Sequence, residues 1–245
     1  MARDYPKLLI IIPTYKEAGV IGHNLIMLDR FLKKNRFRDY LIVVADADSP
    51  DGTRDQVESV INKVDSLEYL STGAVRGKGY QVKLAMLKYQ ADYKLFMDAD
   101  FATPLKHLLE VKVKIEDNSD LAVGIRDVLT SHTGLRRWIS SIGNILTRVI
   151  LGLNIADTQC GFKVFRSDVA ELVFAKQTLD GWGFDMEILL IAKKYHYKID
   201  TIKIDDWQDI QEGSKISGQN PLGIAIDVFG EMVRVRVNSI LGKYS

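Results

Sequence analysis

Two aspartates one residue apart, Asp98 and Asp100, follow an apolar run in the stretch "LFMDADFATP" (95–104). In an extended segment alternate side chains point to the same side, so both carboxylates can bind one cation. Hard oxygen ligands suit Mg²⁺ or Mn²⁺, and such an ion would bridge the carboxylates to a diphosphate. Thr103 and Pro104 fit equally well with a solvated loop that leads into a helix, so the pair alone leaves both interpretations open.

Three further polar segments each follow an apolar run: "PTYKEA" (13–18), "ADADSPDGT" (45–53) and "STGAVRGKG" (71–79). In the last of them, the glycines of "RGKG" would let the backbone approach a phosphate closely, and Arg76 and Lys78 would add positive charge. A plain turn before a helix explains the same glycines. "DSPDGT" is mainly a turn signal, so Asp46, at the strand edge before it, is the ligand contact that we expect there.

An alternation of expected strands and helices positions these segments. Short apolar runs predict strands, and stretches with apolar residues three and four apart predict helices between them. The strands are expected at residues 7–13, 40–46, 67–72, 93–98 and 120–125, and the helices at 17–34, 53–64, 79–90 and 105–116. Repeated strand-helix-strand units predict an α/β fold, a mostly parallel sheet flanked by helices, with ligand sites at the carboxyl ends of the strands.

The second half of the chain is less regular. We expect a helix at about residues 135–151, a polar loop, a helix at 184–194, a strand at 198–204 and a final amphipathic helix. No repeat, low-complexity segment or linker divides the chain. It is therefore expected to form a single domain.

Composition excludes several classes of protein. With 245 residues, 47% of them hydrophobic, the chain can bury a sizeable core, which argues against disorder. The 33 Lys and Arg against 32 Asp and Glu leave a net charge of +1, so we expect no nucleic-acid partner. One cysteine, Cys160, cannot form an internal disulfide and fits a reducing compartment. The best candidate for a membrane span, residues 138–156, carries Arg148 and two asparagines, so no span is expected.

At this point the sequence resembles a known family. The segments "IIPTYKEA", "DADSPDGT", "RGKGYQV", "MDADFATP", "GIR", "DTQCGFKVF", "GWGFDMEILLIA" and "EGSK" occur in the order and spacing seen in family 2 glycosyltransferases of the dolichyl-phosphate glucosyltransferase type, relatives of the dolichyl-phosphate mannose synthases. The resemblance covers roughly residues 7–217, and "DTQCGFK" followed by "FDMEI" and "EGSK" is its most specific part. It implies a GT-A fold and a divalent metal. It also implies inverting transfer of a hexose, glucose favoured, from a nucleoside-diphosphate sugar to a polyprenyl or dolichyl phosphate at the cytoplasmic face of a membrane.

The resemblance assigns roles to individual residues. Those expected to bind the donor are Pro13, Tyr15, Glu17, Asp46, Arg76, Lys78 and Asp98, and those expected to bind the metal are Asp98 and Asp100. Those expected to bind the acceptor phosphate are Arg126, Arg136, Ser140 and Lys163. Asp157 and Asp185 are the candidates for orienting the sugar or the attacking phosphate. Alternatives remain: Asp157 as a turn residue, Asp185 as a residue that the helix dipole stabilises, and Arg136 as a surface charge.

The chain also departs from the family pattern. Ala47 and Asp48 stand where the family usually has the second aspartate and the glycine of "DDGS". This leaves the base of the donor, uracil or guanine, open.

The expected chemistry follows from the acceptor. A phosphate monoester has its second pKa near 6, so a polyprenyl phosphate is largely dianionic at neutral pH and is already a nucleophile. A strong general base is therefore not required. The site must neutralise the departing diphosphate and position the attacking phosphate.

Three parts of the single domain are expected: a donor-binding part at about residues 1–125, an acceptor-binding part at about 126–220 and a C-terminal helix at about 221–245. In that helix Ile224, Val228, Met232 and Val235 share one face, with two arginines nearby. This face could lie in lipid headgroups, or could pack against the domain or a dimer partner. We expect peripheral membrane association, and a homodimer or a separate membrane anchor remains open.

Two other functional classes remain open. A nucleotidyltransferase that makes the nucleotide-sugar would be expected to begin with a glycine- and arginine-rich loop, and "IIPTYKEAG" is unlike one. A non-catalytic nucleotide-sugar binder would bind nucleotide without turnover. Within the same family, GDP-mannose as donor or a non-lipid acceptor is the nearest alternative.

Overall fold

The computed structural model of the chain describes residues 7–73, 77–126, 146–207 and 221–245. Their strands form one seven-stranded sheet with the order β3-β2-β1-β4-β6-β5-β7. The pairs β1·β2, β1·β4, β2·β3 and β5·β7 are parallel, whereas β6 runs antiparallel to both of its neighbours. The strands are β1 (Leu8–Thr14), β2 (Tyr40–Asp46), β3 (Leu67–Ser71), β4 (Tyr93–Met97), β5 (Leu121–Arg126), β6 (Phe162–Arg166) and β7 (Ile199–Ile204). The predicted mostly parallel α/β sheet is confirmed.

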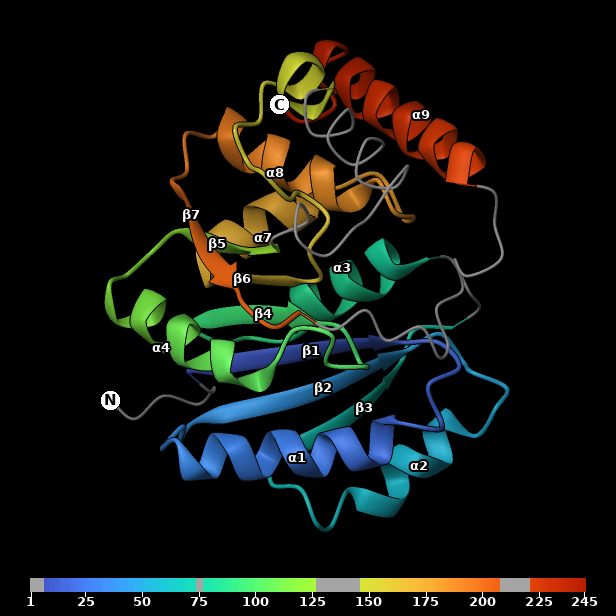
Figure 1. Cartoon of the computed structure of the whole chain (residues 1–245), viewed down its shortest axis with the longest axis vertical. Helices are drawn as coiled ribbons and strands as arrows, with labels where there is room; N and C mark the ends of the chain where they lie inside the picture. The colour runs from blue at the N-terminus through green and yellow to red at the C-terminus, as the bar shows by residue number, and fades with distance from the viewer. Residues whose placement is uncertain (1–6, 74–76, 127–145, 208–220) are drawn as a thin grey trace.

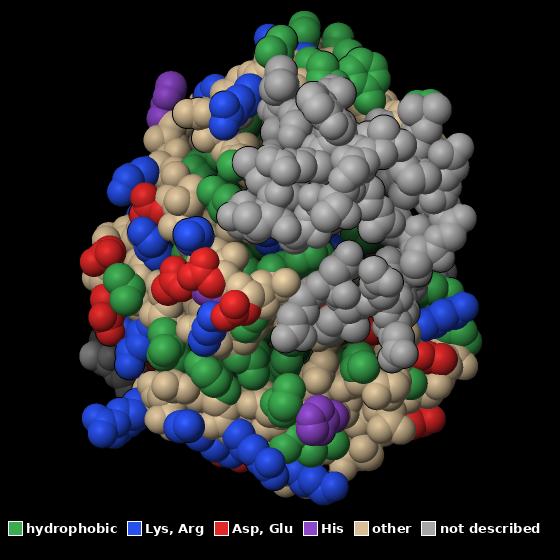
Figure 2. Space-filling model, in the orientation of Figure 1, with side chains coloured by type: hydrophobic (Ala, Val, Ile, Leu, Met, Phe, Trp, Pro, Cys, Tyr) green, Lys and Arg blue, Asp and Glu red, His purple; other side chains and the backbone are tan. Residues whose placement is uncertain are grey.

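Helices cover both faces of this sheet (Figure 1). The helices are α1 (Ile21–Lys34), α2 (Thr53–Val60), α3 (Lys78–Lys88), a 3₁₀ turn η1 (Leu105–His107), α4 (Leu108–Glu116), α7 (Ser167–Lys176), α8 (Phe184–Lys194) and α9 (Pro221–Ile240). Side chains of α1, α2 and α4 pack on one face, and those of α3, α7, α8 and α9 belong to the core on the other. Lys and Arg side chains lie along the outer side of α1 (Figure 2).

Strand β1 shows why the sheet is buried on both faces. All seven of its residues are buried. Leu9 and Ile11 point into the core under α3 and α8, and Ile10 and Ile12 point into the core under α1 and α2. A strand between two helical layers needs apolar side chains on both faces, which is why an unbroken apolar run predicts it.

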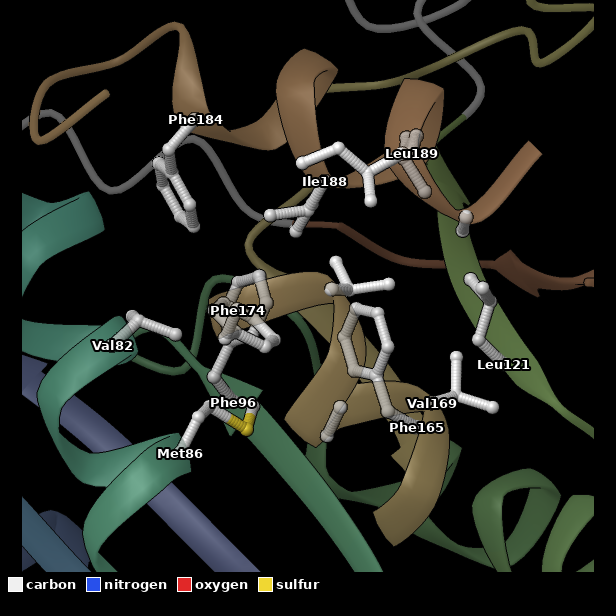
Figure 3. Close-up of a cluster of buried hydrophobic side chains, with 14 of the residues drawn as sticks. Val82, Met86, Phe96, Leu121, Phe165, Val169, Phe174, Phe184, Ile188 and Leu189 are labelled. Atoms are coloured by element: carbon white, nitrogen blue, oxygen red, sulfur yellow. The ribbon is translucent and has the colours of Figure 1, made fainter. Parts of the chain in front are cut away.

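Aromatic side chains fill the core beneath α8. Phe96 of β4 lies 5.7 Å from Phe184, the first residue of α8, and Phe165 of β6 meets Phe174 of α7 edge to face at 5.4 Å, as ring centroids. Figure 3 shows these four rings pointing toward one another from different elements. This packing fixes the end of β4 relative to the beginning of α8. Asp98 follows β4 directly, and Asp185 is the second residue of α8.

The prediction missed β6 and α7. The region was expected to be a polar loop, but residues 162–166 are a strand in which all but Arg166 are buried. Lys163, the second residue of this strand, interrupts the apolar run that would have predicted it. The next residues form a helix with Val169, Ala170, Val173 and Phe174 on its buried side, which is an ordinary helical pattern.

Helix boundaries differ in places. Residues 17–20 form a turn that closes on the Glu17 carbonyl, so α1 begins at Ile21, and α2 ends at Val60 rather than at residue 64. Of the helix expected at 135–151, the described residues 146–151 are helical. The final helix is confirmed as α9, and within the described residues no helix is long and apolar enough to cross a membrane.

The face of α9 that was expected to meet lipid or to pack inward packs inward. Met232 and Val235 are buried, and Val228 is partly buried against the same core. The side chain of Ile224 lies outside the described residues. The interpretation of this face as a lipid contact is therefore wrong, and its alternative, packing against the domain, is correct.

Candidate active site

The polar groups gather where four parallel strands end. Thr14 ends β1, Asp46 ends β2, Asp98 follows β4 and Arg126 ends β5. Because β6 runs the other way, its beginning lies at this same edge and brings Lys163 beside them. The expected clustering at the carboxyl ends of the strands is therefore what the topology produces.

Asp98 is a half-exposed acid of the site. Its side chain is 43% exposed and forms an ion pair with Lys78, the first residue of α3. Its other side lies against the backbone: a Cβ on Gly161 would fall 1.9 Å from Asp98 Oδ2. Burial disfavours the charge on Lys78, but Asp98 and Asp185 outweigh that effect, so the pKa of Lys78 lies above its ordinary value. Lys78 is therefore a cation across the neutral pH range.

Asp100 lies two residues further along the same turn. The backbone N–H of Ala102 donates to its Oδ1 at 3.0 Å. Burial, and the negative charge of Asp98 with it, raise the pKa of Asp100, although the Ala102 hydrogen bond acts in the opposite direction. A divalent cation held by both carboxylates would remove this electrostatic cost.

The donor set of these two aspartates fits Mg²⁺ or Mn²⁺. Both ions prefer carboxylate oxygens and keep further positions for water and phosphate. The described residues contain no group of three or more His, Cys, Asp or Glu side chains that could hold a metal. Asp98 and Asp100 would therefore need the oxygens of a bound diphosphate to complete the coordination.

A second ion pair lies deeper in the protein. Lys163 has 0% exposure, and its ammonium pairs with Asp185 and donates to the Cys160 carbonyl at 2.7 Å. Burial raises the pKa of Asp185, against the opposing effect of Lys163 and Lys78. The ammonium groups of Lys163 and Lys78 lie 5.3 Å and 5.8 Å from the centre of the Phe96 ring. Lys163 and Asp185 therefore pair in the interior with almost no exposed surface, and their predicted roles in acceptor binding and catalysis stay predictions.

Arg126 and Asp157 form a third pair. Arg126 donates to Asp157 through Nε at 2.5 Å and through Nη2 at 3.0 Å, and its guanidinium lies 5.0 Å from the ring centre of Trp207. Burial opposes the charge of Arg126, but Asp157 raises the pKa of Arg126 above its ordinary value. Asp157 is itself buried. It orients Arg126, as a two-point contact between planar groups does.

Asp46 is fully enclosed by hydrogen-bond donors. It accepts from the hydroxyls of Thr14 and Ser49, from the backbone N–H of Ser49 and from the hydroxyl of Tyr69. Its exposed surface is 0%. In this structure Asp46 holds the turn after β2, and its contact with a donor stays a prediction.

The remaining predicted residues divide into two groups. Pro13 is buried at the end of β1, and Tyr15 and Glu17 are half-buried in the turn that follows. The backbone N–H of Glu17 donates to Thr53 Oγ1 at 2.9 Å, which ties this turn to the beginning of α2. Three predicted residues lie outside the described part of the chain: Arg76, Arg136 and Ser140.

The glycines of "RGKG" accommodate the chain itself. A Cβ on Gly77 would fall 2.4 Å from the carbonyl oxygen of Asp180, and one on Gly79 would fall 2.7 Å from Cβ of Phe184. Gly77 also has φ +123°, a conformation that residues with side chains rarely adopt. The segment that leads into α8 thus lies directly beside these two glycines. The phosphate interpretation had expected a ligand in that place.

Cys160 packs as a small apolar group, as expected. It is buried beside Gly124, and burial raises the pKa of its thiol to about 11. A thiol of this kind is a poor nucleophile at neutral pH.

The sequence did not single out three residues that shape the site: Gly161, Trp207 and Gln81. Gln81 donates to the carbonyls of both Thr14 and Ala45 and so joins the ends of β1 and β2. Gly161 and Trp207 act through neighbours distant in sequence, Asp98 and Arg126. Two of them lie inside the family segments, Gly161 in "DTQCGFK" and Gln81 in "RGKGYQV", and these positions were the signal that could have identified them.

Comparisons with known proteins agree with this geometry. The family model "Glycosyl transferase family 2" matches residues 9–174. The chain therefore belongs to glycosyl transferase family 2 and is a glycosyltransferase, and its sheet has the GT-A fold.

The relatives are more specific. A dolichyl-phosphate beta-glucosyltransferase of Dictyostelium discoideum is 32% identical over 252 residues, which cover 96% of this chain and 75% of that protein. One from Saccharomyces cerevisiae is 31% identical over 264 residues, covering 97% and 76%. This chain is therefore similar to dolichyl-phosphate beta-glucosyltransferases over most of both lengths.

Solved structures share the fold at low identity. Mannosyl-3-phosphoglycerate synthase from Rubrobacter xylanophilus superposes with a TM-score of 0.71 at 16% identity, over 96% of this chain and 74% of that one. Glucosyl-3-phosphoglycerate synthase from Mycobacterium tuberculosis, in complex with Mn²⁺, UDP and glucosyl-3-phosphoglycerate, gives 0.65 at 14% identity, over 97% and 80%.

Proposed function

We propose that this glycosyltransferase moves a hexose, with glucose favoured, from a UDP-sugar to a polyprenyl or dolichyl phosphate, with inversion at the sugar carbon and with Mg²⁺ or Mn²⁺ bound. The observation that carries the proposal is the pair Asp98 and Asp100 at the end of β4 with the cation Lys78 across from it. The names of the relatives support the sugar and the acceptor. The Mn²⁺ and UDP bound to the glucosyl-3-phosphoglycerate synthase of Mycobacterium tuberculosis support the metal and the base.

In the proposed reaction a phosphate oxygen of the acceptor attacks C1 of the hexose while the bond from C1 to the donor diphosphate breaks. The products are a hexosyl lipid phosphate and a nucleoside diphosphate. A bound metal would supply charge neutralisation for the leaving diphosphate. The attacking dianion needs no base, because it has already lost its proton at neutral pH.

The residues of the chain have separate tasks in this reaction. Lys78 adds positive charge beside the leaving group. Arg126, which Asp157 orients, lies at the end of β5 and is placed to bind the acceptor phosphate. Lys163 and Asp185 hold this arrangement from within the core.

The proposal extends to organisation and place. Residues 1–125 would carry most of the donor site, residues 126–220 most of the acceptor site, and 221–245 the C-terminal helix. A lipid acceptor requires that the protein meets a membrane surface, and we propose the cytoplasmic face.

The test is transfer by the purified protein. We would supply UDP-glucose, UDP-galactose, GDP-mannose and GDP-glucose, each with Mg²⁺ or Mn²⁺, and offer a short polyprenyl phosphate or 3-phosphoglycerate as acceptor. Mass spectrometry of products should show a glucosyl polyprenyl phosphate from UDP-glucose. Product with GDP-mannose alone, or with 3-phosphoglycerate alone, would correct the donor or the acceptor. Nucleotide binding without any product would indicate a non-catalytic binder.

Two variants test the metal role. Asp98→Asn and Asp100→Asn should lower kcat/KM about 100-fold or more, because a metal contributes several kcal/mol of charge stabilisation. They should also weaken Mn²⁺ binding by titration calorimetry. Asp55→Asn, at an exposed aspartate in the first turn of α2, is the matched control and should change neither quantity.

A further inference from the structure

Helix α9 carries a second apolar face, opposite to the buried one. Its members are exposed by 39% to 70%: Ile226, Phe229, Val233, Val237 and Ile240, followed by Leu241 just after the helix. Spacings of three and four residues place them on one side of a helix. Met232, Val235 and Asn238 lie on the other side and are buried. We call the exposed set the outer face of α9.

Positive charges border the outer face. Arg234 and Arg236 are exposed and lie roughly 80° to either side of its midline at 100° per residue. Lys243 follows as a third exposed cation. Of the two acids in α9, Asp227 is exposed, whereas a carboxylate oxygen of Glu231 is turned inward against Gly183. The border is therefore mostly basic.

The helical residues 146–151 add to the same side of the molecule. Leu146, Ile150 and Leu151 belong to the core that Met232 and Val235 of α9 also enter. Val149 on their outer side is 76% exposed and follows the exposed Arg148. Hydrophobic side chains gather at the upper end of the molecule in Figure 2, where Figure 1 draws these residues and α9.

The end of the chain holds α9 in place. Tyr244 is buried and donates to Glu187 of α8 at 2.8 Å, and Asn238 donates to Thr178 Oγ1 at 3.1 Å. These contacts fix which side of α9 faces outward. Because α8 begins with Phe184 and Asp185, the outer face has a set orientation relative to the site.

We propose that the outer face of α9 binds the surface of a lipid bilayer that contains anionic lipids, with its apolar side chains among the acyl chains and Arg234 and Arg236 at the headgroups. An apolar stripe bordered by arginines is the arrangement that binds such an interface. It is the opposite face from the one that the sequence pattern had indicated.

A second copy of the chain fits this surface less well. Two copies would bring the same basic borders together, which repels. The stripe is about 22 Å long and roughly 10 Å wide, or about 220 Å², well below the roughly 800 Å² per partner of a stable interface. An anionic membrane matches the border in charge and has no such size requirement.

Vesicle sedimentation tests the proposal with the protein alone. Wild type should bind phosphatidylcholine vesicles with about 30% phosphatidylserine at least tenfold more tightly than vesicles without it, because each basic residue near an anionic surface strengthens binding. Phe229→Asn with Val237→Asn should weaken binding at least tenfold. The control pair Leu109→Asn with Val113→Asn changes side chains of α4 with similar exposure and should leave binding unchanged. Arg234→Gln with Arg236→Gln should remove most of the preference for phosphatidylserine.

This proposal rests on the proposed function in one respect: the lipid acceptor is the reason for binding a membrane. The outcomes of the experiments distinguish the two proposals. Absence of wild-type binding to the vesicles would overturn the membrane proposal. An equal loss of binding in the Phe229 and Val237 double variant of α9 and in the Leu109 and Val113 control of α4 would overturn it as well. So would a dimer in analytical ultracentrifugation that the Phe229 and Val237 changes dissociate. Transfer to a short, water-soluble polyprenyl phosphate should be equal in wild type and the α9 variants, whereas transfer to a vesicle-embedded acceptor should fall in the variants. Failure of both transfers in wild type would count against the enzyme activity and leave the vesicle result standing.

Discussion

At the scale of the residue, Lys78 and Lys163 show how burial makes two ion pairs of the same kind behave differently. Lys78 pairs with Asp98, which is 43% exposed, whereas Lys163 pairs with Asp185 in the core. An exposed carboxylate can exchange its partner for a metal or a phosphate at little desolvation cost. A buried pair cannot, because parting it would leave a charge uncompensated in the interior. Asp98 can therefore take up a new partner, whereas Asp185 is held by Lys163 in this structure, and its predicted catalytic role stays a prediction.

Gly161→Ala should impair the site and leave the fold intact. A Cβ there would fall 1.9 Å from Asp98 Oδ2, so the Asp98 side chain must turn away from Lys78. We expect kcat/KM to fall at least tenfold, since a metal site depends on the placement of its ligands. The free energy of unfolding should change by less than about 1.5 kcal/mol, because a flexible side chain can move. Gly181→Ala, where a Cβ meets nothing within 4 Å, is the control in the same region. Wild-type kcat/KM in Gly161→Ala would show that this placement of Asp98 does not matter.

At the scale of the element, the antiparallel strand β6 is what completes the site. Inserted between β4 and β5, it brings its beginning to the edge where those strands end. The turns at this edge are sharp: Lys16, Asp48 and Phe101 have φ of 61°, 48° and 54°. Asp48 stands where the family usually has glycine, and aspartate is among the residues that tolerate this conformation best.

A glycine pair tests the contact between α3 and the segment before α8. Gly77→Ala should cost at least about 3 kcal/mol of unfolding free energy, because φ +123° is strained and a Cβ would fall 2.4 Å from the Asp180 carbonyl oxygen. Gly73→Ala has φ +78° and no neighbour within 4 Å, so it should cost about 1 kcal/mol. Urea unfolding with linear extrapolation measures both. Equal losses would show that the Asp180 contact contributes nothing.

At the scale of the whole molecule, Tyr244 and Ser245 join the end of α9 to the helices α7 and α8. Lys176 of α7 donates to the Ser245 carbonyl at 2.7 Å, and Tyr195 donates to the Tyr244 carbonyl at 3.1 Å. Tyr244 itself donates to Glu187, which also accepts from Thr178 and from the backbone N–H of Leu179. The chain end is thereby joined to the helix that carries Asp185.

Alkaline pH should weaken the contact between Tyr244 and Glu187 and so lower the free energy of unfolding. Burial, and then Glu187, raise the pKa of Tyr244 above its ordinary value. The unfolded chain therefore loses the phenol proton first, and stability present below about pH 10 is lost as the pH rises further. Tyr244→Phe should cost about 1 kcal/mol at pH 7 and should reduce the fall above pH 10. Tyr40 and Tyr69 shift in the same direction, so part of the fall should remain. Urea midpoints from pH 7 to 11 give the slope, and a slope equal to that of wild type would contradict the assignment.

The sequence by itself determined the features that depend on local pattern. Apolar runs and helical spacing located the six parallel strands, the helices between the first five of them, α8 and α9. The motifs located Asp98 and Asp100 after β4 and Lys78 at the beginning of α3. Strand β6 was not predicted because Lys163 interrupts its apolar pattern. The ion pair with Asp185, a residue distant in the sequence, allows a lysine to be buried there.

Only the tertiary structure decided which charges meet and which surfaces are covered. Arg126 pairs with Asp157 across 31 residues and Lys163 with Asp185 across 22, separations that the strand order sets. The same holds for α9: its two apolar faces look alike in the sequence, and one became core because α8 and the chain end pack on it. Local spacing determines that a face is apolar, whereas its neighbour in space determines whether water, protein or lipid meets it.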